Sequence, residues 1–288
     1  MKLNPKIAII ADAGRGTRFL PTTKTVAKSL IPVGNKPILL WILEEIRNAG
    51  IKNVIIVANK YNFSALSNFV EYDKDLLDYL KDKNKEYLLE EYLQIIQELN
   101  IEIVVQPKVM GYGTGAPLLI VSSIIGNQDF AYLYGDDLVF YKNAGMLKQM
   151  LNALEQYKDM KVVGVNAVQA MPKQEISKYG VIKPVKKLDD TVSTFKYIVE
   201  KPDVKSAPSN LASYGRYIFP GKFFDVLKQM RDQILSENPE LFIQPAMVEL
   251  AKEGPFLAVA GNDTKWCTTG DPKNLYIAWQ EWYKRFVK

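Results

Sequence analysis

The sequence contains no histidine and only one cysteine, Cys267, among its 288 residues. A disulfide within the chain is therefore excluded, and so are zinc sites built from cysteine and histidine. Catalysis by a Ser-His-Asp triad or a Cys-His pair is excluded as well. Any chemistry must use carboxylates, lysines, arginines, backbone amides or a hard metal ion.

Long apolar runs are missing too. No stretch of about eighteen apolar residues could span a membrane, and the first ten residues are too short and too interrupted for a signal peptide. We therefore expect a cytoplasmic protein with no membrane contact. Basic residues form no long tract of the kind that binds nucleic acid, so no nucleic-acid partner is expected either.

Positive charge is concentrated near the N-terminus. The chain carries a formal net charge of +5, and residues 12–36 alone carry +4, with Asp12 as their single acid. The five bases of this segment are Arg15, Arg18, Lys24, Lys28 and Lys36. Such a concentrated cationic patch favours an anionic ligand.

The pattern of apolar runs predicts an α/β protein. A buried strand over 6–11 runs into a glycine-rich loop, and a helix follows over 36–50, with Pro37 at its first position and Gly50 as its cap. A second buried strand over 53–59 completes a parallel βαβ unit. With 48% hydrophobic residues, the chain suits one large α/β domain or two small ones.

Further elements continue this pattern. Residues 71–99 fit an amphipathic helix or helical hairpin, which packs on the surface or binds a partner. After about residue 170 the sequence pattern changes. Over 178–202 polar and apolar residues alternate, which predicts antiparallel strands around a turn at Asp189 and Asp190. The other strands are expected at 101–107, 129–140, 161–168, 212–220 and 255–261, and the other helices at 111–125, 144–157, 221–236, 244–253 and 271–286.

No linker marks a domain boundary, so we expect one domain over 1–288. Its nucleotide-binding half covers about 1–170. Its second half covers about 171–288 and ends in the helix over 271–286.

The loop after the first strand is typical of a phosphate site. Gly14 and Gly16 allow positive φ and close approach of a ligand, and successive N–H groups can form an anion nest. Arg18, Lys24 and Lys28 supply charged donors that suit a triphosphate. An ordinary tight turn with solvated bases is the alternative. The P-loop motif is absent, and Phe19 stands where a dinucleotide fingerprint needs its third glycine.

"ADAGRGTRFLPTTKTVAKSLIPVGNKPIL", residues 11–39, resembles the signature of sugar-1-phosphate nucleotidylyltransferases, in the form of their bacterial UTP–glucose-1-phosphate uridylyltransferase branch. The matching residues are Gly14, Gly16, Thr17, Arg18, Leu20, Pro21, Thr23, Lys24, Lys28, Pro32, Lys36 and Pro37. The later segments "VVQPKVMGYGTG", "YGDD", "KYGVIKP", "VEKP", "APSNLASYGRYIF" and "WCTTGDPKNLYIA" follow in family order. The resemblance therefore covers nearly the whole chain.

This resemblance implies a fold and a reaction. The fold is Rossmann-like, with three α/β/α layers around a mixed, mostly parallel sheet. The reaction is attack by glucose 1-phosphate on the α-phosphorus of UTP, giving UDP-glucose and pyrophosphate with the help of Mg²⁺. Positioning and charge neutralisation are enough for this chemistry, which suits a chain without histidine.

The resemblance also implies roles for the nucleotide side of the site. Arg18 clamps the β- and γ-phosphates, Lys28 bridges phosphates near the reacting centre, and Asp136 is catalytic as the magnesium ligand. Gln106 reads the base, which lies against Gly111. The nucleotide and its phosphates are held by Ala11, Ala13, Gly14, Gly16, Thr17 and Lys24.

On the sugar side, Gly180, Glu200 and Asn210 bind the sugar, and Lys201 is the catalytic residue that holds its phosphate. These positions also have structural interpretations. Asp136 and its neighbour Asp137 could be turn or cap residues, and the Glu200-Lys201 segment could be an exposed turn.

Several residues depart from the family pattern. Ala27 replaces a proline, Ser29 replaces a glutamate, and Asp12 replaces an alanine. Thr268 stands where the family has a second metal-binding aspartate, so the metal site is altered unless another acid substitutes. Asp271 and Asp263 are the two acids near enough in sequence to do so.

Three functions stay open at this point. The chain could be an active uridylyltransferase, a relative that uses another nucleotide or sugar phosphate, or a non-catalytic protein that binds a nucleotide sugar as a sensor. The retained catalytic residues favour the first. A homodimer or homotetramer is expected, formed through 71–99 or the terminal helix.

Overall fold

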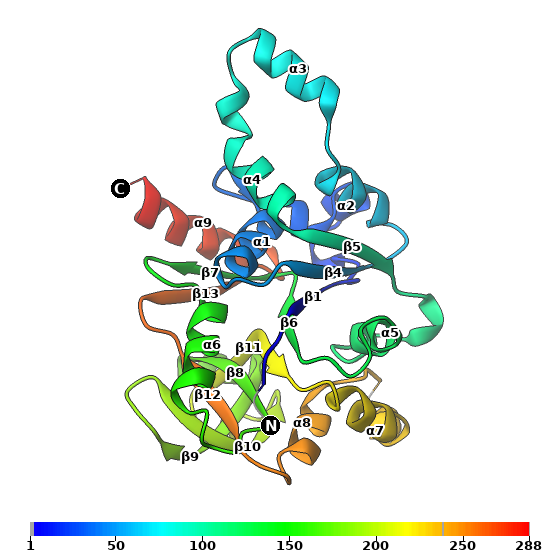
Figure 1. Ribbon diagram of the computed structural model, residues 1–288. Helices are drawn as coiled ribbons and strands as arrows, with labels where there is room; N and C mark the ends of the chain where they lie inside the picture. Colours follow the sequence, from blue (N-terminus) through cyan, green and yellow to red (C-terminus); the bar gives the residue numbers. More distant parts are fainter. Residues whose placement is uncertain (1–2, 238, 288) are drawn as a thin grey trace.

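A nine-stranded mixed sheet forms the centre of the computed structural model, which describes residues 3–237 and 239–287 (Figure 1). The strand order is β5-β4-β1-β6-β11-β8-β12-β10-β9. In chain order these strands are β1 (Ile7–Asp12), β4 (Asn53–Ala58), β5 (Asn100–Val105), β6 (Phe130–Tyr134), β8 (Gly164–Ala170), β9 (Gly180–Lys187), β10 (Val192–Glu200), β11 (Leu211–Phe219) and β12 (Phe256–Ala260).

The first four strands of this order, β5, β4, β1 and β6, pair in parallel. The sequence predicts a strand at each of these places, and it marks β1 and β4 as buried. Because the carboxyl ends of parallel strands meet at one edge, the residues after them gather there. That edge carries the glycine-rich loop, Gln106 and Asp136.

Helices cover both faces, so the α/β class with three layers is confirmed. Along β1, Ala8 and Ile10 belong to one apolar core and Ile7 and Ile9 to the other, as the alternation of a strand requires. The nine helices of the described chain are α1 (Ile38–Asn48), α2 (Phe63–Val70), α3 (Lys74–Asp82), α4 (Glu90–Glu98), α5 (Ala116–Ile125), α6 (Met146–Gln156), α7 (Phe223–Glu237), α8 (Gln244–Leu250) and α9 (Pro272–Phe286). Helices α1 and α6 pack in the first core, and α5, α7 and α8 pack in the second.

The mixed sheet is confirmed, but parallel pairing is not its majority pattern. Among the described strands of this sheet, four pairings are parallel and five are antiparallel, the fifth joining β9 to β11. The antiparallel pairs begin where β11 folds back beside β6. The predicted hairpin over 178–202 adds another pair, because β9 and β10 are joined by a short turn.

The expected single strand over 129–140 is wrong. It is two strands, β6 and β7 (Asp137–Tyr141), and β7 leaves the large sheet to pair with β13 (Thr264–Thr268), a strand that the sequence did not reveal. The turn between β6 and β7 holds Asp136. Asp136 therefore lies between two strands, and Asp137 begins the second of them.

Three predicted helical segments are present, and one of them begins differently from the prediction. Residues 71–99 form a helical hairpin, in which α3 extends away from the sheet and α4 returns to pack against α1 (Figure 1). Pro37 is the N-cap of α1 and not its first residue, because Lys36–Pro37 forms strand β3, paired with β2 (Pro32–Val33). The predicted terminal helix starts at Pro272 as expected.

Candidate active site

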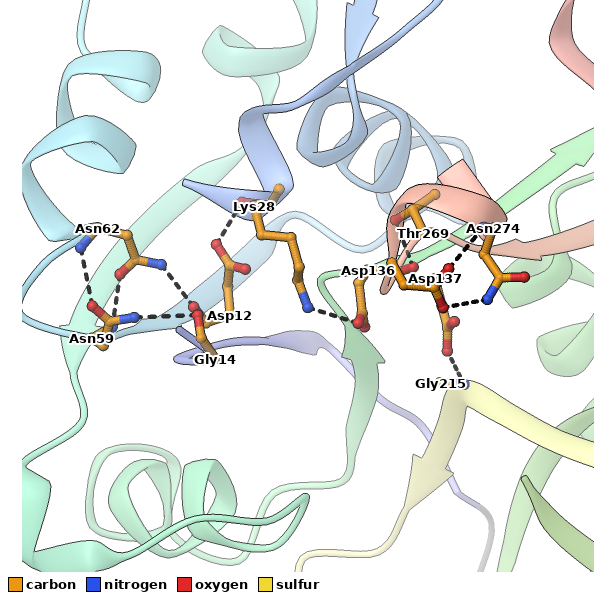
Figure 2. A network of polar contacts seen from close by, with 12 residues as sticks. Asp12, Gly14, Lys28, Asn59, Asn62, Asp136, Asp137, Gly215, Thr269 and Asn274 are labelled. Atoms are coloured by element: carbon orange, nitrogen blue, oxygen red, sulfur yellow. Dashed lines mark hydrogen bonds and ion pairs between the residues drawn. The ribbon is translucent and has the colours of Figure 1, made fainter. Parts of the chain in front are cut away.

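The glycine-rich loop after β1 is held in one conformation by its neighbours. Gly16 has φ 59°, and a Cβ there would lie 2.9 Å from Thr23 Cγ2, so only glycine fits without strain. Thr23 Oγ1 donates to the Gly16 carbonyl at 2.8 Å. From the far side, Asn59 Nδ2 donates to the Ala13 carbonyl. Asn62 Nδ2 donates to the Asp12 carbonyl (Figure 2). The loop is therefore pre-formed.

Lys28 and Asp136 both line the cavity and face each other there. Lys28 Nζ donates to Asp136 Oδ2 at 2.6 Å (Figure 2). Burial favours the neutral form of each group, but their mutual attraction outweighs it, lowering the pKa of Asp136 and raising the pKa of Lys28. Both groups are therefore charged near neutral pH, the state needed for binding phosphate and a cation.

Asp12 and Ser29, two departures from the family pattern, touch each other. Ser29 Oγ donates to Asp12 Oδ2 at 2.5 Å, and both side chains are buried. Burial raises the pKa of Asp12 to about 7, against the opposing effects of Ser29 and Lys28. Asp12 does not line the cavity, so the structure gives it no direct contact with a ligand.

Asp12→Asn is expected to make stability less dependent on pH. The raised folded-state pKa means that the native state holds a proton which the unfolded state has lost, so the wild-type free energy of unfolding falls as pH rises from about 4 to about 7. Three pKa units correspond to about 4 kcal/mol, an upper bound on the gain of the variant over wild type at pH 8. Urea unfolding at pH 4.5 and pH 8 measures it.

Asp190→Asn is the matched control, since that aspartate is exposed in a turn. An Asp12→Asn variant whose stability changes with pH as steeply as the wild type would contradict the burial effect.

The turn that carries Asp136 is anchored on both sides. On one side, Thr269 donates to the Asp136 carbonyl through its backbone N at 2.7 Å and its Oγ1 at 2.8 Å. On the other, the Asp137 carboxylate accepts from Trp266 Nε1 and from the Gly215 backbone N, both at 2.8 Å. The Asp137 carboxylate thus holds the turn, while the Asp136 carboxylate faces the cavity and Lys28.

A buried ion pair supports the same turn. Arg216 is fully buried and donates to the Glu45 carboxylate at 2.9 and 3.0 Å. The same guanidinium donates to the Asp137 carbonyl at 2.8 Å. Glu45 in turn accepts from the Leu147 backbone N at the start of α6. The pair therefore ties α1, α6, β7 and β11 together beneath the turn.

These groups surround a cavity of about 790 Å³, a volume typical of small-molecule sites. Twelve of the predicted site residues line it: Ala11, Ala13, Gly14, Gly16, Thr17, Arg18, Lys28, Gln106, Asp136, Gly180, Glu200 and Lys201. Lys24, Gly111 and Asn210 are not on its wall. Lys24 and Asn210 are exposed, and Gly111 accepts from Gln106 Nε2 at 2.9 Å through its carbonyl.

Thr268 lies beside Asp136, as the resemblance implies. A Cβ built on Gly270 would be 3.2 Å from Asp136 Oδ2, 3.5 Å from an Arg18 guanidinium nitrogen and 3.6 Å from Thr268 Oγ1. Asp271 also lines the cavity, but both its carboxylate oxygens accept from Asn274 as the cap of α9. Asp263 lies in an exposed turn outside the cavity.

The side chains present fit a divalent cation whose coordination is completed by substrate phosphates and water. Among the described residues no group of three acidic, cysteine or histidine side chains gathers, so the protein offers the Asp136 carboxylate with the Thr268 hydroxyl nearby. Mg²⁺ commonly binds through one or two carboxylates together with substrate phosphates and water. The residues present therefore suit a site that forms with a bound nucleotide.

Glu200, the last residue of β10, and Lys201, which follows it, also line the cavity. The Glu200 carboxylate lies 3.8 Å from Lys201 Nζ. Burial raises the pKa of Glu200, Lys201 lowers it and Glu240 raises it, with a net upward shift. Lys201 has a positive φ of 47°, uncommon for a residue with a side chain, and its ammonium lies over the Phe242 ring.

An aromatic wall that the sequence did not indicate completes the cavity. It is formed by Tyr134, Tyr179, Tyr214, Tyr217 and Trp266. These residues come from strands or their ends, where alternation predicts only that one face is buried and not that it faces a ligand. The missed strand β13 supplies Trp266, whose ring stacks on Tyr214 at 4.8 Å between centroids.

The family model described as nucleotidyl transferase matches residues 7–284. This chain belongs to the nucleotidyl transferase family. UTP–glucose-1-phosphate uridylyltransferases of Staphylococcus haemolyticus and Mycoplasma pneumoniae are each 37% identical to it. Their alignments cover 79% and 78% of this chain and 76% of each relative.

Solved structures of the same kind resemble the whole nucleotidyl transferase chain. A UDP-glucose pyrophosphorylase in complex with UDP-glucose has a TM-score of 0.85 at 31% identity, covering 98% of this chain and 100% of that one. A UTP-bound enzyme of Acinetobacter baumannii has a TM-score of 0.85 at 26% identity, covering 98% and 95%. Nucleotidyltransferases of this kind generally use a divalent metal. None of the helices in the described residues has the length and apolar character needed to cross a bilayer.

Proposed function

We propose that this nucleotidyl transferase transfers the uridylyl group of UTP to glucose 1-phosphate, with release of pyrophosphate. The observation that carries the proposal is the single cavity that joins the glycine-rich cationic loop to the Lys28–Asp136 pair and to Glu200 and Lys201. Relatives with that name at 37% identity support it.

The chemistry needs no covalent intermediate. An oxygen of the sugar phosphate attacks the α-phosphorus of UTP, and the bond from that phosphorus to the β-phosphate oxygen breaks. Arg18 pairs with the leaving pyrophosphate, and Lys28 neutralises charge near the reacting phosphorus. Lys201 holds the phosphate of the sugar, so that the two substrates meet in line.

We also propose Mg²⁺ as the metal, held by Asp136 with nucleotide phosphates. When bound, the ion neutralises charge that develops on the phosphate oxygens. The other residues that line the cavity bind the substrates. The loop over 11–17 binds the nucleotide, Gln106 binds the base, and Gly180 and Glu200 bind the sugar. Lys24, Gly111 and Asn210, which lie off the wall, would contact substrates only after a movement of their loops.

In this proposal the residues over 1–170 bind the nucleotide and those over 171–288 bind the sugar phosphate. The protein acts in the cytoplasm, where nucleoside triphosphates are available. It assembles as a homodimer or homotetramer through the α3–α4 hairpin, which carries exposed Tyr72, Tyr79 and Tyr87, or through α9.

A pyrophosphate-release assay over a grid of nucleoside triphosphates and sugar 1-phosphates, with and without Mg²⁺, tests the function. UTP with glucose 1-phosphate should give the highest kcat/KM. Higher turnover with another pair would overturn the substrate assignment. Tight binding of UDP-glucose without pyrophosphate release from any pair would identify a sensor instead.

Lys201→Ala is expected to raise the KM for glucose 1-phosphate about 10- to 100-fold while leaving the KM for UTP unchanged, because it removes one charge-assisted contact to phosphate. Steady-state kinetics with each substrate varied in turn measures it. Lys205→Ala is the matched control, since that lysine is exposed and off the cavity wall. An unchanged KM for the sugar phosphate would remove Lys201 from the site.

A further inference from the structure

Gln244, the first residue of α8, reaches the cavity from an element to which the sequence assigns no role. The segment just before it is fixed to the loop before α5. Gly115 N donates to the Leu241 carbonyl at 2.7 Å, and Ile243 N donates to Thr114 Oγ1 at 3.1 Å. The backbone of Gln244 is therefore held firmly at the cavity wall.

The side chain of Gln244 is 5% exposed, yet its Oε1 atom has no hydrogen-bond partner within the described part of the chain. Four buried side-chain atoms there lack a partner, and three of them belong to cavity residues: Gln106, Glu200 and Gln244. Leaving such an atom unpaired costs about 1–3 kcal/mol. Their concentration on one wall indicates that a ligand supplies the missing partners.

Gln244 and Glu200 both lie against Gly180 at the cavity wall. A Cβ built on Gly180 would lie 3.0 Å from Glu200 Oε2, which is one of the unpaired atoms, and 3.4 Å from Gln244 Nε2. A side chain at position 180 would crowd both polar groups, so glycine is needed for them to approach each other here. A carboxylate and an amide therefore meet at this part of the cavity wall.

This pair of groups suits a polyol. A hydroxyl both donates and accepts, so it can donate to the Glu200 carboxylate or to Gln244 Oε1 and accept from Gln244 Nε2. A phosphate has no proton to donate to a carboxylate near neutral pH, and Lys201 already offers it a cation. The nucleobase has its own unpaired group in Gln106, on a different strand end.

We propose that Gln244 is a specificity-determining residue for the sugar: its amide and the Glu200 carboxylate bind hydroxyl groups of the hexose across the face of Gly180. The inference rests on the proposed function, because it names a contact to the acceptor substrate of that reaction. Sugars that lack the hydroxyl facing Gln244, or that carry it in the opposite configuration, are therefore poor substrates.

The test compares glucose 1-phosphate with its 2-, 3-, 4- and 6-deoxy analogues in the wild type and in Gln244→Met, a change that keeps side-chain length and removes the amide. For at least one position, the wild type should lose tenfold or more in kcat/KM when the hydroxyl is absent. In Gln244→Met the loss at that position should shrink to less than threefold, because the partner is already gone. The KM for UTP should stay at its wild-type value.

Gln149→Met is the matched control. The Gln149 amide bonds to the Ala144 carbonyl and to the Asn262 backbone, away from the cavity. The Gln149→Met variant should show the same preference among the deoxy analogues as the wild type. Gln244→Leu repeats the test with a branched side chain if the methionine variant does not fold.

Gln244 variants that keep the full wild-type loss at every hydroxyl position would overturn the inference while leaving the proposed function intact. Absence of turnover by the wild type with every sugar 1-phosphate would instead overturn the proposed function, and the role of Gln244 in it.

Discussion

Asp136→Asn is expected to lower kcat/KM for UTP and glucose 1-phosphate by about a thousandfold or more, corresponding to about 4 kcal/mol of lost transition-state stabilisation. Asp136 is the ionised carboxylate that faces both Lys28 and Thr268 in the cavity. The amide that replaces it is a much weaker ligand for a hard cation. It also leaves the Lys28 ammonium without its counter-charge.

Two measurements separate these effects. The dependence of the rate on magnesium concentration should flatten or shift to far higher concentrations in Asp136→Asn. Binding of Mn²⁺ in the presence of UTP, followed by paramagnetic resonance, should weaken in parallel. Asp263→Asn is the matched control, because that aspartate lies in an exposed turn off the cavity wall. Unchanged magnesium titration curves in the Asp136 variant would remove this residue from the metal site.

Arg216→Met is expected to destabilise the fold by about 3–5 kcal/mol, because it leaves the Glu45 charge buried without its partner. Both side chains are essentially inaccessible, at 0% and 1% exposure. The Asp137 and Gly215 carbonyls lose their donors at the same time. Urea unfolding at constant pH measures the loss.

The double variant Glu45→Leu with Arg216→Met should lose less stability than the two single variants together, since no isolated charge stays buried. Lys222→Met serves as the control for the exposed pair between Lys222 and Glu253, where solvent screens the interaction and little change is expected. A cost for Arg216→Met as small as that of the control would contradict the structural role of the pair.

Much of the first half of the fold follows from local patterns. The apolar runs at 6–11 and 53–59, each bounded by turn residues, predict the buried strands β1 and β4 and the helix between them. The strand over 129–140 was predicted wrongly, because apolar residues stand on both sides of Gly135, Asp136 and Asp137, and nothing local shows that the strand ends there. Its division depends on β13, which pairs with β7 from more than a hundred residues further along the chain.

The site shows the same division. Glycines, arginines and lysines near the N-terminus indicate an anion site from their chemistry alone, and the structure brings Arg18, Lys28 and Asp136 to one wall. Nothing local in the sequence marks Gln244 or Trp266, since a glutamine at a helix start and a tryptophan in a strand are ordinary residues. Their contacts come from helix α8 and strand β13, far along the chain.

The sequence by itself excluded histidine and disulfide chemistry, and it determined the βαβ start and the cationic, glycine-rich character of the loop after β1. These depend on residue type and on short-range backbone preferences, which a linear pattern contains. Only the tertiary structure decided that Asp12 meets Ser29, that Thr268 lies beside Asp136, and that Gln244 faces Glu200 across Gly180. Such contacts join residues distant in sequence, and the packing of the sheet and its two helical layers sets their distances.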